Sequence, residues 1–276
     1  MRLENIVILS VFASFAVLEM AKVGFFRKTG SVAGDGWVET ISTLLLLLLV
    51  QPVIILSVFT LGDTFFADYK GALAHYPIVL QVALLLVFDD MMQYWWHRLT
   101  HRVPLLYKLH RPHHNTAYMS VRLVYRNSFL YYAFMPSIWL SAIMIYLGFG
   151  WVYAFYIAVK LTVITAAHCS VAWDEPLYKT ALGNRIMWWV ERIISTPSTH
   201  SMHHGKHLND GVSHYKGNYG NLLFFWDVLF GTAKITRRRP TTFGVENLPD
   251  TTPLEQLFWP LFSTGKAAKA EKNCEL

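Results

Sequence analysis

Apolar residues occur in this 276-residue chain as long continuous blocks, not as an alternating or one-sided pattern. A helix needs about 20 consecutive apolar residues to cross the hydrocarbon core of a bilayer. The blocks predict membrane-spanning helices at about 3–24, 38–61, 76–96, 129–147 and 151–168. The pattern therefore predicts an all-α polytopic membrane bundle of four to five transmembrane helices.

The first block has the position of a secretory signal peptide, but it lacks a small-residue cleavage site. It also carries Glu19 and Lys22 at its end and is followed by another span. We therefore expect it to remain in the mature protein. The two long segments 97–128 and 169–276 are more polar, and we expect them to form a helical cap at one end of the bundle.

Composition supports the membrane assignment. Hydrophobic residues make up 54% of the chain and charged residues 15%, which is far more apolar than a soluble domain. The net charge of +6 does not indicate nucleic-acid binding, because the basic residues lie beside apolar blocks, where anionic lipid headgroups attract them. We expect no nucleic-acid partner.

The placement of lysine and arginine predicts which side of the membrane the cap occupies. With five spans, the cap lies on the same side as Lys22. That side collects most of the clustered basic residues, which are Arg98, Arg102, Lys108, Arg111, Arg122, Arg126 and Arg237–Arg239. The cap is therefore predicted to face the cytoplasm, at a bacterial inner membrane or the endoplasmic reticulum. His75 falls on the opposite side and is excluded as a metal ligand.

Eight of the twelve histidines lie in three clusters, with the sequences HRLTH, HRPHH and HSMHH. Their members are His97 and His101; His110, His113 and His114; and His200, His203 and His204. Imidazole is the commonest protein metal ligand, and it binds a metal without adding charge. One cluster alone could be a set of surface histidines at the level of the lipid headgroups. Three clusters in one chain predict a metal centre at a membrane surface.

Helical spacing explains the order of residues within each cluster. Positions i, i+3 and i+4 share one helix face, so the members of a cluster are expected to point the same way. Adjacent histidines such as His113 and His114 diverge by about 100° on a helix of 3.6 residues per turn. Such a pair suits two metal ions better than one.

The clusters sit in longer motifs. These are D-x-x-x-Y-W-W-H-R-x-x-H from Asp90, H-x-x-H-H from His110, T-P-x-x-H-x-x-H-H from Thr196 and N-Y-G-N-L-L-F-F-W-D-V-L-F-G-T from Asn218. Together, over about 85–235, they resemble the fatty acid hydroxylase / sterol desaturase superfamily. The resemblance implies a membrane-embedded oxygenase with two iron ions that hydroxylates, or sometimes desaturates, lipid chains or sterols. The eight clustered histidines match its ligands.

The resemblance also implies a division of the chain into three parts. These are an N-terminal transmembrane region at 1–75, a hydroxylase-like catalytic domain at 76–240 and a C-terminal cytoplasmic tail at 241–276.

Three further histidines are candidates for the site. His168 closes the fifth block and resembles the family's isolated histidine between the second and third clusters, although a histidine at a span end can also be an interfacial anchor. His207 follows the third cluster by one helical turn, and His214 precedes the NYG motif. Each of these two could be a further ligand or a hydrogen-bond partner of a ligand.

The resemblance makes iron the expected metal. Breaking an unactivated C–H bond needs an oxidant that side chains cannot provide. Zinc could activate water for hydrolysis, but it has no redox chemistry. No G-x-G-x-x-G follows a predicted strand, so the electrons are expected from an external carrier and an NAD(P)H-dependent reductase. A basic cytoplasmic surface would suit an acidic carrier.

Asp90 and Tyr94 lie on the same helical stripe as His97 and His101, which makes them candidates to support the ligands. A carboxylate behind a ligating imidazole fixes its tautomer. Asp90 lies about 10 Å from His97 along the helix axis, so we expect it to reach a different cluster. Asp227 is a second candidate of this kind, or else a helix cap or part of a surface salt bridge.

Among the charges in the predicted spans, Asp89, Asp90 and Lys160 fall at mid-depth. Lys160 and Asp89 each lie eight residues before a candidate ligand, at the same expected depth. Charges inside a membrane are usually paired. We therefore predict that Lys160 pairs with Asp89 or Asp90 inside the bundle.

The substrate is not determined by the sequence. Arg122, Arg126 and Asn127 could hold a phosphate headgroup, or they could be ordinary positive-inside residues. We predict a lipid hydroxylase whose substrate enters from the bilayer. The alternatives are a desaturase or methyl oxidase with the same ligands, a zinc-dependent membrane hydrolase, and a non-catalytic metal-binding or transport protein.

Overall fold

The computed structural model describes residues 3–26, 30–248 and 251–263. Its regular structure is helical, and these ranges contain no strand, only two isolated bridges, Ile194–Leu223 and Gly205–Phe243. The prediction of an all-α fold is confirmed. Residues 264–276 of the predicted C-terminal tail lie outside the described residues.

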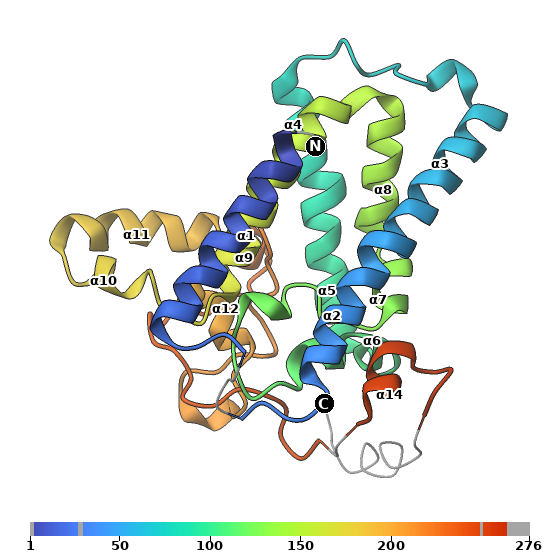
Figure 1. Ribbon diagram of the computed structural model, residues 1–276. Coiled ribbons are helices and arrows are strands. Elements are labelled where there is room, and N and C mark those ends of the chain that lie inside the picture. Colours follow the sequence, from blue (N-terminus) through green and yellow to red (C-terminus); the bar gives the residue numbers. More distant parts are fainter. Residues whose placement is uncertain (1–2, 27–29, 249–250, 264–276) are drawn as a thin grey trace.

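Long helices run roughly side by side and form the bundle (Figure 1). The first is α1 (Leu3–Lys22). Two long helices follow, each made of three labelled parts: α2 (Asp35–Leu45), η1 (Leu46–Val50) and α3 (Gln51–Phe65), and then α4 (Ile78–Leu85), η3 (Leu86–Met91) and α5 (Met92–Arg102). The bundle is completed by α8 (Pro136–Met144) with η5 (Ile145–Phe149), and by α9 (Gly150–His168). Three helical ranges are long and apolar enough to cross a membrane: Asp35–Phe65, Ile78–Arg102 and Pro136–His168.

The predicted span at 129–147 is wrong as a single helix. It consists of α7 (Phe129–Ala133) and α8, and α8 begins at Pro136. Proline lacks an N–H and fits the first turn of a helix but not its interior. From Pro136 to Phe149 the chain rises about 21 Å at 1.5 Å per residue, less than the roughly 30 Å of a hydrocarbon core. The number of spans therefore stays a prediction.

The chain reverses direction between α8 and α9 at Gly148. This residue has a φ of 111°, which glycine adopts without steric cost. A Cβ at this position would lie 2.7 Å from the Cβ of Ala74, so the space requires glycine as well. The turn is thereby packed against the segment that joins α3 to α4, at the end of the bundle opposite α6 and α12 (Figure 1).

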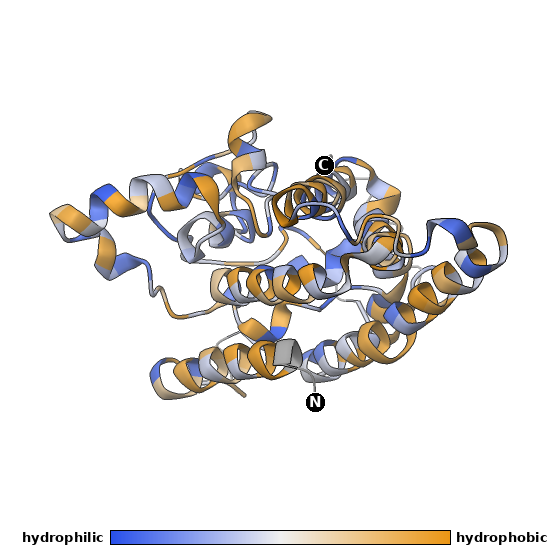
Figure 2. Ribbon diagram, turned by 90° about the horizontal axis from the view of Figure 1, so that it is seen from above, coloured by the Kyte–Doolittle hydropathy of each residue, from blue (hydrophilic) through white to orange (hydrophobic). Residues whose placement is uncertain are grey.

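The outer surface of the bundle is apolar. Leu48, Val79 and Phe155 are each more than 70% exposed, whereas the charged residues Glu19 and Asp90 are almost completely buried. Hydrophobic residues run along most of the helical turns (Figure 2). Apolar surface on this scale would be unstable in water but is stable against lipid. This pattern supports the membrane assignment.

Shorter helices form the rest of the fold. They are η2 (Ala67–Tyr69), α6 (Pro104–His114), η4 (Val121–Leu123), α7, α10 (Glu175–Tyr178), α11 (Ala181–Ile193), α12 (Pro197–His203), η6 (Leu208–Asp210), α13 (Phe225–Leu229) and α14 (Pro253–Phe258). Helices α6, α12 and α14 lie around the ends of α5 and α9, while α10 and α11 project sideways (Figure 1).

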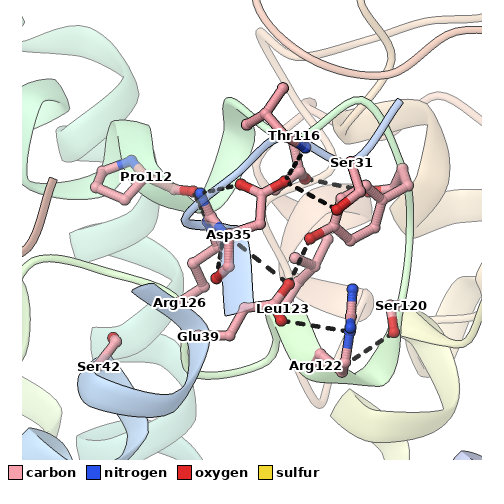
Figure 3. A network of polar contacts seen from close by, with 12 residues as sticks. Ser31, Asp35, Glu39, Ser42, Pro112, Thr116, Ser120, Arg122, Leu123 and Arg126 are labelled. Carbon is pink, nitrogen blue, oxygen red and sulfur yellow. Dashed lines mark hydrogen bonds and ion pairs between the residues drawn. The ribbon is translucent and has the colours of Figure 1, made fainter. Parts of the chain in front are cut away.

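A buried network of charges fixes the segment between α6 and α7 (Figure 3). The guanidinium of Arg126 is 1% exposed and lies 2.9 Å from the carboxylate of Asp35. It also donates to the carbonyl of Pro112 at 2.7 Å and to the Oε1 of Gln256 at 2.8 Å. Arg126 therefore joins α6, α2 and α14 to one another.

The structure shows that Arg126 and Asn127 both have partners inside the protein. Both are buried, at 1% and 3% exposed, and their side chains are hydrogen-bonded to other residues of the chain. Arg122 is the more exposed of the two arginines, and it pairs with Glu39 at 3.3 Å and lies over the ring of Tyr118. These residues hold the fold together, because buried charges are stable only when they are paired.

Candidate metal centre

Each histidine cluster lies at the end of a helix on the same side of the bundle. His97 and His101 belong to α5, the second cluster to α6, and His168 is the last residue of α9. In the third cluster, His200 and His203 belong to α12 and His204 follows it. The structure thus brings together residues that are up to 107 positions apart in the sequence.

Helix α12 has a well-defined beginning. Thr196 precedes it, with Pro197 in the first turn, and the side chains of Thr196 and Thr199 each accept a hydrogen bond from the other's backbone N–H. This reciprocal arrangement is a capping box. The buried carboxylate of Asp174 also accepts from the N–H of Ser198 at 2.8 Å. The T-P part of the motif therefore orients the helix that presents the third cluster.

Nine histidines form two groups. Within each group the ligand atoms lie within 4.8 Å of one another. The first group is His97, His101, His110, His114 and His203, and the second is His113, His168, His200 and His204. Each group could hold one metal ion.

Adjacent histidines divide between the two groups, as the helical spacing predicts. His113 and His204 belong to the second group, while their neighbours His114 and His203 belong to the first. The two HxxHH clusters therefore link the groups, and each of the two helices contributes to both.

The Nε2 atoms point inward in both groups. The Nε2 of His97 lies 2.9 Å from that of His203, and the same distance separates His168 from His200. The Nε2 of His114 lies 3.1 Å from that of His101. Two nitrogens that bind one ion at about 2.1 Å and at right angles to each other are about 3 Å apart. The observed spacing is that of neighbouring ligands on a single ion.

The other ring nitrogen of several of these histidines is held by an oxygen that can only accept. Nδ1 of His97 lies 2.7 Å from the carbonyl of Tyr219, and Nδ1 of His203 lies 2.7 Å from that of Gly217. Similar contacts join His113 to Leu123 O, His168 to Ile164 O and His110 to Asn127 Oδ1. The proton must therefore be on Nδ1, which leaves the lone pair of Nε2 free for a metal.

Burial favours the neutral form of the six histidines of the second and third clusters. Burial, reinforced by the neighbouring imidazoles, lowers the pKa of each well below its usual value near 6.5; they are His110, His113, His114, His200, His203 and His204. A neutral imidazole is the form that binds a metal. The donor set, its tautomers and its spacing therefore fit two transition-metal ions.

His207 and His214 lie outside both groups. His207 is 44% exposed and contacts Glu246 at 2.5 Å, and the Nε2 of His214 lies 3.2 Å from the carbonyl of Thr232. Among the hydrogen bonds between described residues, those of His207 and His214 do not reach a histidine of either group. His75 is exposed and belongs to the segment between α3 and α4, which lies at the opposite end of the bundle (Figure 1), so its exclusion agrees with the geometry.

Asp90 contacts the tail motif and not a histidine cluster, which corrects the expectation from the sequence. Its carboxylate accepts from the N–H groups of Leu222 and Leu223 at 3.3 and 3.1 Å and from the indole of Trp226 at 2.8 Å. Tyr94 likewise bonds Thr232 at 2.9 Å and accepts from Arg98 at 3.1 Å. Asp90 of η3 and Tyr94 of α5 therefore dock the segment 218–232 onto this continuous helix.

That segment in turn supplies the carbonyls that orient two histidines. Asp227 is buried and accepts from the N–H groups of Tyr219 and Gly220 at 2.8 and 2.6 Å and from Thr232 at 2.6 Å. A Cβ on Gly220 would lie 2.9 Å from the carboxylate of Asp227, so this close approach requires glycine. The N-Y-G motif therefore holds the Tyr219 carbonyl against His97, and Asp227 is neither a helix cap nor part of a surface salt bridge.

Sequence reasoning did not find the role of Asn127. Its Oδ1 lies 2.8 Å from Nδ1 of His110, and its Nδ2 donates to the hydroxyl of Tyr132 at 2.9 Å. The sequence gives no signal for this contact, because an asparagine seventeen residues after a histidine has no periodic relation to it.

The predicted ion pair inside the bundle is confirmed. Nζ of Lys160 lies 2.5 Å from the carboxylate of Asp89, and both side chains are buried. The hydroxyl of Tyr156 donates to the same carboxylate at 2.7 Å.

Comparison with known proteins agrees with this geometry. The profile of the fatty acid hydroxylase family matches residues 82–232, more than half of the chain. Human alkylglycerol monooxygenase is 27% identical over 186 residues, covering 63% of this chain and 35% of the human protein. Ornithine lipid hydroxylase OlsE of Rhizobium tropici is 32% identical over 164 residues, covering 57% of this chain and 43% of that protein. No solved structure matches the chain.

The fold and the site thus define a helical protein with three helical ranges that are long and apolar enough to span a membrane and a histidine-rich site that fits two metal ions. The chain belongs to the fatty acid hydroxylase family, as the sequence motifs predict. The chain spans less than half the length of these two relatives.

Proposed function

We propose that this protein is a membrane-bound di-iron monooxygenase that hydroxylates a lipid, using O2 and electrons from outside the chain. The observation that carries the proposal is the pair of histidine groups with inward-facing Nε2 atoms, in a chain that belongs to the fatty acid hydroxylase family. The names of the two relatives, a monooxygenase and a hydroxylase of lipids, support the same reaction class.

The histidines of the two groups would hold the two iron ions, His97 and His203 among the first set and His113 and His168 among the second. When bound, iron would supply the oxidation of a C–H bond by O2, which side chains cannot carry out. The chain's own part is to keep the imidazoles neutral and oriented, through the carbonyls of Tyr219 and Gly217. Residues of the α5, α8 and α9 helices would position the lipid beside the site.

Electrons would come from an external carrier and an NAD(P)H-dependent reductase. The described residues offer no strand-turn-helix unit of the kind that binds a nicotinamide or flavin. Arg102, Lys108 and Arg185 are among the basic residues of the cap, and they would favour docking of an acidic carrier.

The site would lie at the cytoplasmic face of the membrane. The basic residues at the site's end of the bundle support this orientation, because positively charged segments are retained on the cytoplasmic side. At the opposite end, Lys70 is paired with Asp63 at 2.8 Å.

Two measurements test the proposal. Metal analysis of the purified protein should find about two irons per chain, one for each histidine group, whereas zinc without iron would favour hydrolysis. Mass spectrometry of lipids from cells with and without the gene should find a product heavier by one oxygen atom. A product that has instead lost two hydrogens would identify a desaturase.

A further inference from the structure

Helix α11 exposes a stripe of large apolar side chains. They recur at intervals of three or four residues, which places them on one helix face. The members of this stripe are Leu182, Ile186, Trp189 and Ile193. Each of them is between 48% and 70% exposed. A helix on a soluble protein has the reverse arrangement, with its apolar stripe against the core. An exposed stripe of this size indicates a contact with something other than water.

The opposite face of α11 is held by the protein. Met187 and Glu191 lie on that face and are buried. The carboxylate of Glu191 accepts from Nε and Nη2 of Arg237 at 3.0 and 2.7 Å. Turning the stripe toward the protein would break this ion pair and leave a buried carboxylate without its partner, which is costly. The ion pair therefore fixes the outward orientation of the stripe.

The stripe continues into the apolar surface of the bundle. Ile194, directly after α11, forms a bridge with Leu223, which precedes α13. Helix α13 exposes three more apolar side chains, Phe225, Val228 and Leu229. The ring of Phe230 then lies 4.8 Å from that of Trp95. Trp95 belongs to Ile78–Arg102, one of the ranges long and apolar enough to cross a membrane. The surface that covers this range therefore extends to α11.

The direction and the charges of α11 suit a bilayer surface. The helix runs crosswise to α1 and α9 (Figure 1), so it would lie in the plane of a membrane that those helices enter. Arg192 and Arg237 share the single buried carboxylate of Glu191. Arg185, at the edge of the stripe, is exposed and makes no ion pair within the described part of the chain. This excess of positive charge complements lipid phosphates.

We propose that α11 binds the bilayer surface on the side where the histidines lie, with its stripe among the upper acyl chains and Arg185 at the lipid phosphates. Helices of this kind bury their apolar face about 5–10 Å into the boundary between headgroups and acyl chains. Only Ile194 and Ser195 separate α11 from Thr196, the N-cap of α12. The bilayer thereby sets the height of the helix that carries the third histidine cluster. This attachment does not depend on the proposed reaction.

Fluorescence quenching tests this attachment. Single cysteines at Ile186 and Trp189 would carry a small fluorophore in the full, iron-loaded chain in lipid nanodiscs, with Cys274→Ser as background and the buried Cys169 retained. Lipids with a nitroxide on the acyl chain are expected to quench both labels, whereas iodide in the water is not. A label at Asn209, an exposed position in η6, is the matched control and should show the opposite pattern.

Substitution within the stripe assigns the effect to its apolar character. With the label at position 186, Trp189→Glu should cause a loss of quenching by lipid and a gain of quenching by iodide, because a carboxylate is costly among acyl chains. Trp189→Phe keeps an apolar ring and should leave both values unchanged. Asn209→Glu, which places the same charge elsewhere on the surface, should also leave them unchanged.

Three results would overturn the inference. Iodide quenching at positions 186 and 189 as strong as at position 209 would show that the stripe faces water. Energy transfer between labels at position 189 of two chains would show that a second copy covers the stripe. Unchanged quenching in the Trp189→Glu variant would show that the stripe does not hold the helix in the bilayer.

Discussion

At the scale of single residues, the site depends on where each imidazole carries its proton. Backbone carbonyls and one asparagine amide accept from Nδ1 of five histidines, among them His97 and His110. In many metal sites a carboxylate has this function. Here Asp227 acts indirectly. It accepts a hydrogen bond from the backbone N–H of Tyr219, and the carbonyl of Tyr219 in turn accepts from Nδ1 of His97.

Removal of one ligand should empty part of the site. We expect His203→Ala to lower the iron content of the purified protein from about two per chain toward one or less, because His203 supplies an Nε2 to the first group. Metal analysis measures this directly. His207→Ala is the control, since His207 lies outside both groups, and a loss of iron from that variant would contradict the assignment.

The asparagine that orients His110 is expected to matter for metal affinity. Asn127→Ala removes the acceptor of the His110 Nδ1–H, and loss of such a partner typically weakens metal binding 10–100-fold. Competition with a chelator would measure the change. Asn184→Ala, on the exposed side of α11, should leave the affinity unaltered.

The pH dependence of metal binding follows from the lowered histidine pKa values. Because burial keeps the pKa of His200 and His204 well below 6.5, these imidazoles stay neutral as the pH falls from about 7.5 to 6. Metal affinity should therefore be nearly flat over this interval and decrease only at lower pH. A steep decrease centred near pH 6.5 would show that the histidines titrate as exposed ones do.

At the scale of helices, the site is assembled by contacts between elements that are distant in the sequence. Helix positions and the facing of the histidines could be predicted, because apolar length and helical periodicity are local properties. The partners of Arg126 and Asn127, and the docking of 218–232 onto α5, could not be predicted, because they depend on how the helices pack. The α7–α8 break was missed for a different reason, since Pro136 interrupts a block that is apolar throughout.

The buried arginine between α6 and α2 is expected to be essential for stability. Arg126→Met leaves the carboxylate of Asp35 buried without its partner, which typically costs about 3–5 kcal/mol. The midpoint of thermal unfolding in detergent should fall strongly, and iron content should fall with it because α6 loses its anchor at Pro112. Arg238→Met, at an exposed position, should leave both values close to wild type.

At the scale of the whole molecule, the fold places apolar surface outside, buried charges inside and the histidines at one end. This arrangement would let a lipid reach the site from the bilayer while the site itself meets the aqueous phase and an electron carrier. A single cysteine placed at Asp68, in the segment between α3 and α4, or at His207, in the segment after α12, should differ in labelling, because these two segments lie at opposite ends of the bundle (Figure 1). We expect a membrane-impermeant reagent added outside intact cells to modify the Asp68 position and not the His207 position. The reverse pattern would place the site on the other face.

The most direct test of the central claim is oxygen incorporation by the purified, iron-loaded protein. Supplied with a lipid extract, reductant and an electron carrier under isotopically labelled O2, it should yield a lipid that has gained one labelled oxygen atom. Lipid products that carry oxygen from labelled water, or that have lost two hydrogens without gaining oxygen, would contradict the assignment as a monooxygenase.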